Sequence, residues 1–383
     1  MSFLRNNRIR AVLFQVIVLL AIIFFFYNAT GNALSNIESR GIQTGFGFLE
    51  AESGFDIAEH LIDYSPASTN LRVFYVGLIN TLLVSAVGIV FASIIGLIVG
   101  IARLSNNWLI SKLASGYIEL FRNIPILLQI LFWYNLVLTV FPHPKQSFEL
   151  FGSVFINLRG IYLPKPMATD GFMWVIFALI LGVMLKIAIK RYYNKRQDEV
   201  GTKVNTLGYS LLLVAGLPTA VYFILGSPLT FDYPALKGFN FKGGMSLSPE
   251  FLSLAFALSI YTATYIAEAI RAGIESVSKG QKEAAMAMGL TQKQSLRLVI
   301  LPQALRVAIP PIINQYLNLT KNSSLAAAIG YSELVSVFTG TVLNQVGQTV
   351  EIILMTMAVY LTISLLISMV LNLITRQMSI KGQ

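Results

Sequence analysis

Long uninterrupted runs of apolar residues constrain the fold of this 383-residue chain more than any other feature. Runs of about 18 or more apolar residues are typical of membrane-spanning helices, since lipid offers the backbone no hydrogen-bond partners. Only 12% of the residues are charged, against about 25% in an average soluble domain, which excludes a soluble enzyme of ordinary composition. The chain is therefore predicted to be an all-α integral membrane protein. About eight spans are expected, over residues 11–27, 74–102, 118–141, 172–188, 207–225, 251–270, 308–329 and 352–374.

The basic residues indicate how these spans are oriented. If both termini lie in the cytoplasm, the cytoplasmic segments hold 20 of the 28 lysines and arginines, and the outer segments hold 7. This excess follows the positive-inside rule. The formal charge of +10 then reflects topology, so nucleic acid is not expected as a partner. The first apolar run follows Arg5, Arg8 and Arg10 as in a signal peptide, but no small-residue cleavage site follows, and a retained span is expected.

Several classes of chemistry lack the residues that they require. The chain contains no cysteine, and its two histidines, His60 and His143, are far apart in sequence, so no metal site is expected. The phosphate-binding loop of ATPases needs a Gly-Lys-Ser/Thr sequence, and the dipeptide Gly-Lys occurs nowhere in this chain. The chain is thus not expected to be an enzyme, to have catalytic residues or to bind a cofactor itself.

Three segments on the outer side lie outside the predicted spans. Residues 46–61 have loosely helical apolar spacing, which predicts a segment along the membrane surface. Residues 142–171 and 226–249 are rich in Gly, Pro, Phe and Leu and are too short for an independent domain. These two are expected to be lids or packing loops.

The most informative segment is the longest cytoplasmic stretch between spans, residues 271–306. Residues 279–288 favour a helix, and Gly289 suits a left-handed C-terminal stop. Thr291 and Gln294 have the spacing of a capping box, which predicts that a second helix begins there. The segment is therefore predicted to be a helix, a turn and a second helix.

This segment also carries an apolar surface on the cytoplasmic side. The first helix displays small and flexible apolar side chains beside Glu283, namely Ala284, Ala285, Met286 and Met288. Short methionine-bearing helices of this kind suit docking into a groove of a partner protein. Pro302 is expected to interrupt the second helix.

The same segment resembles the EAA loop of ABC importer permeases. The residues that carry this resemblance are Glu283-Ala284-Ala285, Gly289 and Val299-x-Leu301-Pro302, with Val299 where that family usually has isoleucine. Residues 73–140 and 249–375 resemble the polar amino acid (histidine/glutamine-type) permeases. Their matching motifs are Asn80-Thr81, Arg103-Leu104-Ser105, Glu119 to Pro125, Gln129, Tyr265 to Arg271, Lys279-Gly280-Gln281, Pro310-Pro311, Lys321 to Leu325 and Glu333-Leu334.

The resemblance implies a type I ABC importer permease core with cytoplasmic N- and C-termini. It divides the chain into an N-terminal transmembrane helix and periplasmic segment (1–72), the first part of the core (73–140), inserted loops with two extra transmembrane helices (141–248), and the second part of the core (249–383) with the coupling loop at about 271–306. The extra segments resemble the larger permease subunit of general L-amino-acid transporters.

The resemblance also implies partners in a bacterial inner membrane. The residues implied to couple to an ATPase are Glu283, Ala284, Ala285, Gly289, Leu301 and Pro302. A separate ABC ATPase would bind ATP and magnesium. A second, unlike permease chain, a periplasmic amino-acid-binding protein and membrane lipid would complete the assembly. Asn322 and Ser323 stand where many relatives have acidic and threonine residues, which leaves the amino acids carried open.

Two polar stripes inside spans are candidates for a substrate pathway. A charge at the centre of a span costs about 2.5–3.5 kcal/mol on insertion scales unless it is paired or faces a cavity. The stripes consist of Asn314, Asn318 and Lys321 with Ser323 nearby, and of Tyr261 and Thr264. One interpretation is that they line the passage and meet the ammonium and carboxylate of an amino acid. The other is hydrogen bonding between helices, with Lys321 reaching the outer interface.

Four residues near the cytoplasmic side suggest structural or gating roles. Glu268 and Arg271 lie one helical turn apart, which predicts an ion pair that positions the loop. Pro125 disfavours helix at the preceding residue and breaks the third span just after Arg122. This bend is either part of an inner gate or the turn from a surface helix into a span.

These features together predict a permease subunit that moves polar or general L-amino acids from periplasm to cytoplasm, driven by a separate ATPase. The alternative is an ion-coupled secondary amino acid carrier. Such carriers usually show paired halves and intramembrane carboxylates. Here Glu268 is the only acidic candidate near a membrane interior, and no halves are detectable.

Overall fold

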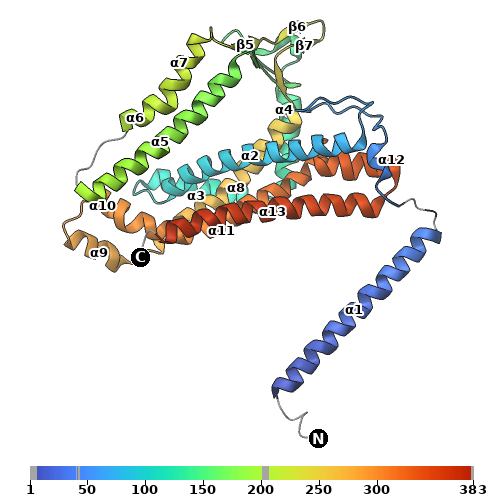
Figure 1. The fold of residues 1–383 in the computed structure, drawn as a ribbon, viewed down its shortest axis with the longest axis horizontal. Helices are drawn as coiled ribbons and strands as arrows, with labels where there is room; N and C mark the ends of the chain where they lie inside the picture. The colour runs from blue at the N-terminus through green and yellow to red at the C-terminus, as the bar shows by residue number, and fades with distance from the viewer. Residues whose placement is uncertain (1–6, 40, 42–43, 201–206, 381–383) are drawn as a thin grey trace. The chain divides into compact units, whose positions relative to one another are not determined.

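The computed structural model describes residues 7–39, 41, 44–200 and 207–380 (Figure 1). Within these ranges six helices are long and apolar enough to cross a membrane. They are Arg10–Asn32, Asn70–Arg103, Phe172–Tyr193, Pro249–Glu275, Gln292–Ile329 and Thr349–Leu373. The predicted helical, multi-pass fold is confirmed.

The predicted third span is two helices that meet at a sharp bend. α3 (Trp108–Asn123) and α4 (Ile126–Val140) form an angle of 102°, so they make one further span at most. Ile124 between them is extended, with ψ 127°, because the ring of Pro125 disfavours a helical conformation at the residue before it. The break at Pro125 is confirmed, and one continuous helix over 118–141 is excluded.

The predicted fifth span is short. It consists of α6 (Leu207–Leu211), the π-helical segment η4 (Leu212–Gly216) and α7 (Leu217–Ile224). Its apolar part, Gly208–Ile224, is shorter than the other candidate spans. The described residues therefore contain six long spans, or up to seven with the bent pair, and the count of eight is not confirmed.

The other helical elements follow in chain order. They are α1 (Asn7–Ser39), the 3₁₀ turn η2 (Gly47–Glu50), α2 (Asn70–Arg103), the 3₁₀ turn η3 (Pro144–Gln146), α5 (Phe172–Val200), α8 (Pro249–Glu275), α9 (Lys279–Ala287), α10 (Gln292–Ser295), the π segment η5 (Leu296–Ile300), α11 (Leu301–Asn322), the 3₁₀ segment η6 (Ser323–Ile329), the π segment η7 (Val335–Val342), α12 (Leu343–Val346) and α13 (Thr349–Ile380).

Residues 44–69 pack on the protein instead of forming a surface helix. Only η2 is helical, and its Phe48 is buried in a cluster with Val73 and Phe338. The amide of Asn70 donates to the Phe48 carbonyl at 2.9 Å. The helical spacing expected over 46–61 is wrong, because this segment forms only one 3₁₀ turn, with Phe48 and Ile57 buried and Phe46 and Leu61 exposed. Its place along a membrane surface stays a prediction.

Glycines bring α2 into close contact with α8 and with η7. A Cβ at Gly96 would lie 2.7 Å from Cβ of Ile266, and one at Gly77 would lie 2.8 Å from Cα of Leu334. No larger residue fits at either position without a shift of its neighbour. Small residues permit this close approach of helices in membranes. α8 is accordingly the most enclosed span, with 72% of its apolar window buried.

Residues 134–252 form a second compact unit that contains all the short strands. One antiparallel sheet has the order β1 (Phe148–Leu150), β2 (Val154–Asn157), β3 (Gly160–Leu163) and β8 (Met245–Leu247). Two further pairs are β4 (Lys165–Ala168) with β5 (Leu229–Asp232), and β6 (Ala235–Lys237) with β7 (Asn240–Lys242). The two segments that were expected to be separate lids or packing loops therefore fold together, since β3–β8 and β4–β5 each join one loop to the other.

A small aromatic core holds these strands. The Phe241 ring is buried between the rings of Phe155 and Tyr162, with centroids 4.7 Å away in both cases. The Tyr162 hydroxyl donates to Oδ1 of Asn240 at 3.1 Å. Burial raises the pKa of Tyr162 above its usual value. The unit thus has its own packing centre outside the spans.

α5 and the α6–α7 stretch form an antiparallel hairpin in the same unit (Figure 1). Gly182 permits the contact, because a Cβ there would lie 2.1 Å from the carbonyl oxygen of Leu213. The rings of Tyr193 and Tyr209 stack nearly parallel at 6.5 Å. Only 11% of the apolar window of α5 is buried.

Candidate functional site

The helix–turn–helix predicted for residues 279–294 is present. α9 ends at Ala287, and Gly289 adopts the left-handed conformation, with φ 78°. The Thr291 hydroxyl accepts the amide of Gln294 at 3.3 Å, and Oε1 of Gln294 accepts the amide of Thr291 at 2.9 Å. This capping box satisfies two of the unpaired N–H groups at the start of α10.

α9 presents a mixed acidic and apolar surface. Met286 and Met288 are 56% and 72% exposed, and Glu283 and Ala284 are exposed beside them. Ala285 was expected to belong to this displayed surface, but it is 1% exposed and packs α9 against the rest of the chain. The other four of these side chains, Glu283, Ala284, Met286 and Met288, are available to a partner.

Pro302 does not interrupt the second helix. The π segment η5 precedes it, in which the amide of Leu301 donates to the carbonyl of Leu296 five residues earlier. This wider turn accommodates the proline ring, and the helical path continues from Gln292 to Asn322. The predicted interruption is wrong, and Leu301 and Pro302 are both exposed in the first turn of α11.

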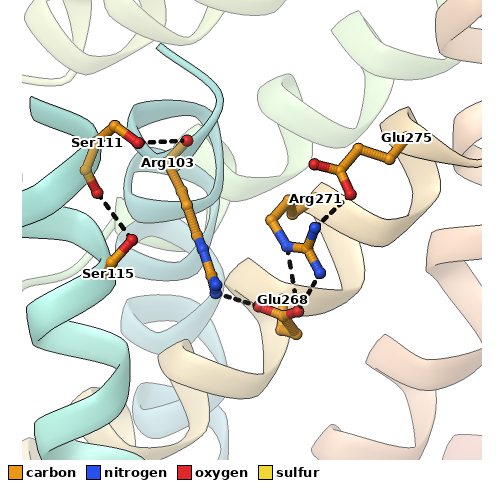
Figure 2. A network of polar contacts seen from close by, with 6 residues as sticks. All are labelled: Arg103, Ser111, Ser115, Glu268, Arg271 and Glu275. Carbon is orange, nitrogen blue, oxygen red and sulfur yellow. Dashed lines mark hydrogen bonds and ion pairs between the residues drawn. The ribbon is translucent and has the colours of Figure 1, made fainter. Parts of the chain in front are cut away.

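An ion-pair network lies where α8 enters the loop (Figure 2). Glu268 pairs with Arg271, as predicted, through contacts of 2.5 Å to Nη2 and 3.1 Å to Nε. Glu268 also pairs with Arg103 at the end of α2, and Arg271 pairs with Glu275. The Ser111 hydroxyl on α3 donates to the Arg103 carbonyl at 3.0 Å. The network thus joins the ends of α2 and α8 to the start of α3.

A close backbone contact joins the other end of the loop to α8. A Cβ at Gly273 would lie 2.6 Å from the Ala304 carbonyl oxygen and 2.9 Å from Cβ of Ala308. The last turns of α8 and the first turns of α11 are therefore in direct contact. The residues between them, which include α9, lie between two fixed points.

The bend between α3 and α4 is held by a buried side chain. Gln129 is 3% exposed, and its Nε2 donates to the carbonyls of Phe121 at 2.8 Å and Ile124 at 2.9 Å. The Phe121 carbonyl has no helical partner because Pro125 has no N–H, and the Ile124 carbonyl has none because Ile124 is extended and the Leu128 amide donates to Pro125. Arg122 lies at the bend, with its guanidinium carbon 5.0 Å from the ring centroid of Tyr265 on α8.

The polar stripe on α11 is present on one face. Asn314, Asn318 and Lys321 are all exposed. Exposed amides and an ammonium on a membrane helix require water or another protein to cover them. Ser323 does not share this face, because it is fully buried and its hydroxyl donates to the Thr320 carbonyl at 2.7 Å.

The stripe on α8 is only partly available. The hydroxyls of Tyr261 and Tyr265 lie 2.9 Å apart, and both side chains are half-buried. Thr264 is fully buried and donates to the Tyr261 carbonyl at 2.7 Å. Of the two residues singled out in this span, only Tyr261 has a side chain that reaches a surface.

A buried carboxylate was missed by the sequence analysis. Glu333 is fully buried, and its oxygens accept the amides of Val335 at 2.9 Å and Ser336 at 2.7 Å. The Tyr360 hydroxyl on α13 also donates to it, at 3.0 Å. Glu268 is therefore not the only acidic residue near an apolar interior. Glu333 lies between two apolar stretches, and this position was the signal available in the sequence.

Within the described part of the chain, no group of three or more His, Asp or Glu side chains is placed to hold a metal ion. The chain is nevertheless closely similar to proteins of one transport family. The family of binding-protein-dependent transport system inner membrane components matches residues 175–380. This chain belongs to that family.

Three relatives cover nearly all of this permease. A putative amino-acid ABC transporter permease, YhdX of Escherichia coli, is 50% identical over 98% of this chain and 95% of its own length. AapQ of Rhizobium johnstonii, a general L-amino acid transport permease, is 46% identical over 99% and 94%. BztB of Rhodobacter capsulatus, a glutamate/glutamine/aspartate/asparagine transport permease, is 39% identical over 98% and 95%.

A solved amino acid ABC transporter with histidines is also similar, with 21% identity and a TM-score of 0.46 over 80% of this chain and 94% of that chain. Family membership and the six long apolar helices make this protein a multi-pass component of a bacterial inner membrane. It is a transport subunit, a permease, of an ABC system.

Proposed function

We propose that this permease imports polar or general L-amino acids from the periplasm to the cytoplasm, driven by a separate ATPase. The names of its three full-length relatives support amino acids as the cargo. The observation that carries ATP coupling is α9, a short helix that ends before the left-handed Gly289 and whose exposed side chains include Glu283, Met286 and Met288. The chain has no phosphate-binding loop of its own, so the energy must reach it through such a surface.

The proposed assembly contains four kinds of component. An ABC ATPase binds ATP and magnesium, and a second, unlike permease chain pairs with this one. A periplasmic amino-acid-binding protein delivers the substrate, and lipid surrounds the spans. The family description and two permeases that share partial similarity, GltJ and GltK of Escherichia coli, support paired permeases in a binding-protein-dependent system.

A push on α9 has two routes into the membrane. The first is the contact of Gly273 with Ala304, which joins α8 to α11. The second is the ion-pair network from Arg271 through Glu268 to Arg103, which joins α8 to α2 (Figure 2). Because both routes use rigid helix ends, a displacement of α9 moves whole helices, as alternating access requires.

The proposed substrate pathway follows the exposed polar face of α11. Asn314 and Asn318 supply amide groups for hydrogen bonds, and Lys321 supplies a cation for a substrate carboxylate. Tyr261 on α8 is the fourth candidate. Ser323 and Thr264 remain proposals of lower rank, because their hydroxyls already donate to backbone carbonyls.

The division of the chain follows the same proposal. Residues 73–140 and 249–383 form the permease core with the coupling loop, and residues 1–72 and 141–248 are additions to it. The bend at Arg122 and Pro125 is proposed as part of the inner gate.

The proposal is tested by charge reversal and by bulk in the coupling loop. Glu283→Lys places a cation where the ATPase is proposed to dock, and Gly289→Leu strains a left-handed turn by about 1 kcal/mol or more. Both variants are expected to abolish amino acid uptake and the stimulation of the ATPase by substrate, while the amount of protein in the membrane stays normal. Uptake by proteoliposomes and phosphate release are the two measurements.

Matched controls lie in the inserted unit. Glu149→Lys makes the same charge change on the exposed strand β1, and Gly238→Leu changes another left-handed glycine with open space around it. Both controls should transport normally. Normal uptake by Glu283→Lys and Gly289→Leu would remove the coupling role from this loop.

A further inference from the structure

The end of α5 that follows its apolar stretch has a high density of positive charge. Residues 186–196 contain five basic residues and no acidic residue. Four of these have described, exposed side chains, namely Lys186, Lys190, Arg191 and Arg196. None of the four forms an ion pair with a carboxylate whose side chain the structure describes. These cations contribute to the positive-inside excess, and the proposed transport function gives them no further role.

The surface that leads to this cluster is apolar and exposed. Ile180, Met184 and Ile187 are 52%, 62% and 46% exposed, and most of α5 is not covered by protein. In a membrane protein such a surface is covered by acyl chains. Phospholipid phosphates lie at the end of this acyl region, at the level where the cations begin.

The length of the apolar stretch places the first cation within reach of these phosphates. Residues 172–185 contain no charged side chain and extend about 21 Å at 1.5 Å per residue. The hydrocarbon core is about 30 Å thick, so the helix reaches Lys186 before the core ends. The lysine stem can lie along the apolar helix while the ammonium extends to the headgroups, as in other short spans.

Tyrosines mark the same level on both helices of the hairpin. Tyr193 on α5 stacks on Tyr209 on α6, and Tyr192 and Tyr209 are 62% and 55% exposed. Tyrosine is enriched at membrane–water boundaries because its ring is apolar and its hydroxyl is wet. The stack fixes the boundary next to Lys190 and Arg191, where headgroup phosphates are found.

We propose that Lys186, Lys190, Arg191 and Arg196 bind the headgroups of anionic phospholipids. A zwitterionic headgroup brings its own cation to the cluster, whereas an anionic one brings only negative charge, so four cations that pair with no carboxylate of the described side chains favour the anionic lipid. The arginines add bidentate hydrogen bonds to phosphate oxygens. The site holds the inserted hairpin in the membrane and is independent of the proposed transport function.

The test compares the lipids retained by the purified chain. The variant Lys186→Gln/Lys190→Gln/Arg191→Gln/Arg196→Gln is extracted gently from membranes that contain phosphatidylglycerol and phosphatidylethanolamine, and retained lipid is counted by mass spectrometry. We expect the preference for phosphatidylglycerol to fall by about tenfold or more, because each cation near an anionic surface contributes several-fold to binding.

Two controls share the chemistry of this change. The first control removes the same charge from the β-strand part of the same unit, through Lys145→Gln, Lys165→Gln, Lys237→Gln and Lys242→Gln. These four lysines are exposed, and their loss should leave the lipid preference unchanged. Lys186→Arg/Lys190→Arg keeps the charge and should also keep the preference. An unchanged preference in the four-Gln variant of α5, or an equal fall in the strand control, would overturn the proposal. Loss of a co-purified protein with unchanged lipid would instead assign the cluster to a protein partner.

A second measurement covers failure of the four-Gln variant to insert. Because the native chain has no cysteine, Gln197→Cys gives one labelling site beside Arg196. A spin label there should be less mobile in vesicles with phosphatidylglycerol than in vesicles of phosphatidylcholine alone, and high salt should remove the difference. Equal mobility in both vesicles would contradict the proposed site.

Discussion

α8 and α5 are both membrane spans, but their relation to the protein interior is opposite. α8 is 72% buried over its apolar window and contains four buried hydroxyl residues, Ser253, Ser259, Thr262 and Thr264. α5 is 11% buried, and its residues 172–185 carry no hydroxyl and no charge. In water the more apolar helix would be the core helix. In lipid the solvent is itself apolar, so the more polar helix lies inside the protein.

The difference shows which forces assemble the two regions. α8 meets α2 through glycines, and the Ser259 hydroxyl of α8 donates to the Gly88 carbonyl of α2 at 3.4 Å. α5 meets its hairpin partner at Gly182 and Tyr193, and most of its apolar window is exposed. Contacts of α8 are therefore expected to determine stability, whereas most side chains of α5 are expected to tolerate change.

The largest expected effect comes from filling the α2–α8 contact. Gly96→Leu would place a side chain where Ile266 and the Ala263 carbonyl already lie, 2.7 Å and 3.1 Å from the new Cβ. The cost should exceed the about 1–3 kcal/mol typical of overpacking, because backbone cannot move aside. Gly208→Leu in the inserted hairpin meets open space and should stay within about 0.5 kcal/mol of the native protein. Thermal unfolding in detergent compares the two, and similar midpoints would contradict the predicted packing.

A smaller effect is expected from truncating one leucine in each helix. Leu254 on α8 is fully buried, whereas Leu179 on α5 is 43% exposed. Leu254→Ala should cost about 1–3 kcal/mol, because lipid removes the transfer part of the usual cost but not the lost packing. Leu179→Ala should change the free energy of unfolding by less than about 0.5 kcal/mol. The measurement is the thermal unfolding midpoint. If Leu179→Ala lowers it as much as Leu254→Ala does, burial does not distinguish these two helices.

The smallest of these effects is expected at the end of α8. Glu268→Gln removes the charge shared by Arg103 and Arg271, each about a quarter exposed, and should cost about 1 kcal/mol. High salt should lower the free energy of unfolding of the native protein until it approaches that of the variant, because salt screens these partly exposed ion pairs. If salt changes the free energy of unfolding equally in the native protein and in Glu268→Gln, the ion-pair network does not contribute to stability.

Sequence patterns predicted the local structure of residues 268–294 well. The left-handed Gly289 that ends α9 and the Thr291–Gln294 capping box each depend on residues at most ten positions apart. A local sequence pattern is therefore enough to predict both. The ion pair of Glu268 and Arg271 is equally local. The long apolar spans were also predictable, because lipid imposes one backbone solution on them.

Contacts between distant segments were not predictable in the same way. Arg103 joins Glu268 across 165 residues, and Glu333 depends on Tyr360 and on the start of η7. The strands of the inserted unit are three or four residues long and pair between two separate loops, which is too short for a period of two to show. Pro302 was misjudged because its neighbours form a π turn, a choice that no residue in the sequence marks.

The central claim is that this permease works only with a separate ATPase. The most direct measurement is to purify the tagged chain gently from its membrane, identify the proteins that accompany it, and assay amino acid uptake after reconstitution. We expect an ATPase with a phosphate-binding loop and a second permease to accompany it, and uptake to require ATP and the binding protein. A chain that purifies alone and takes up amino acids in response to an ion gradient without ATP would contradict the account and establish a secondary carrier.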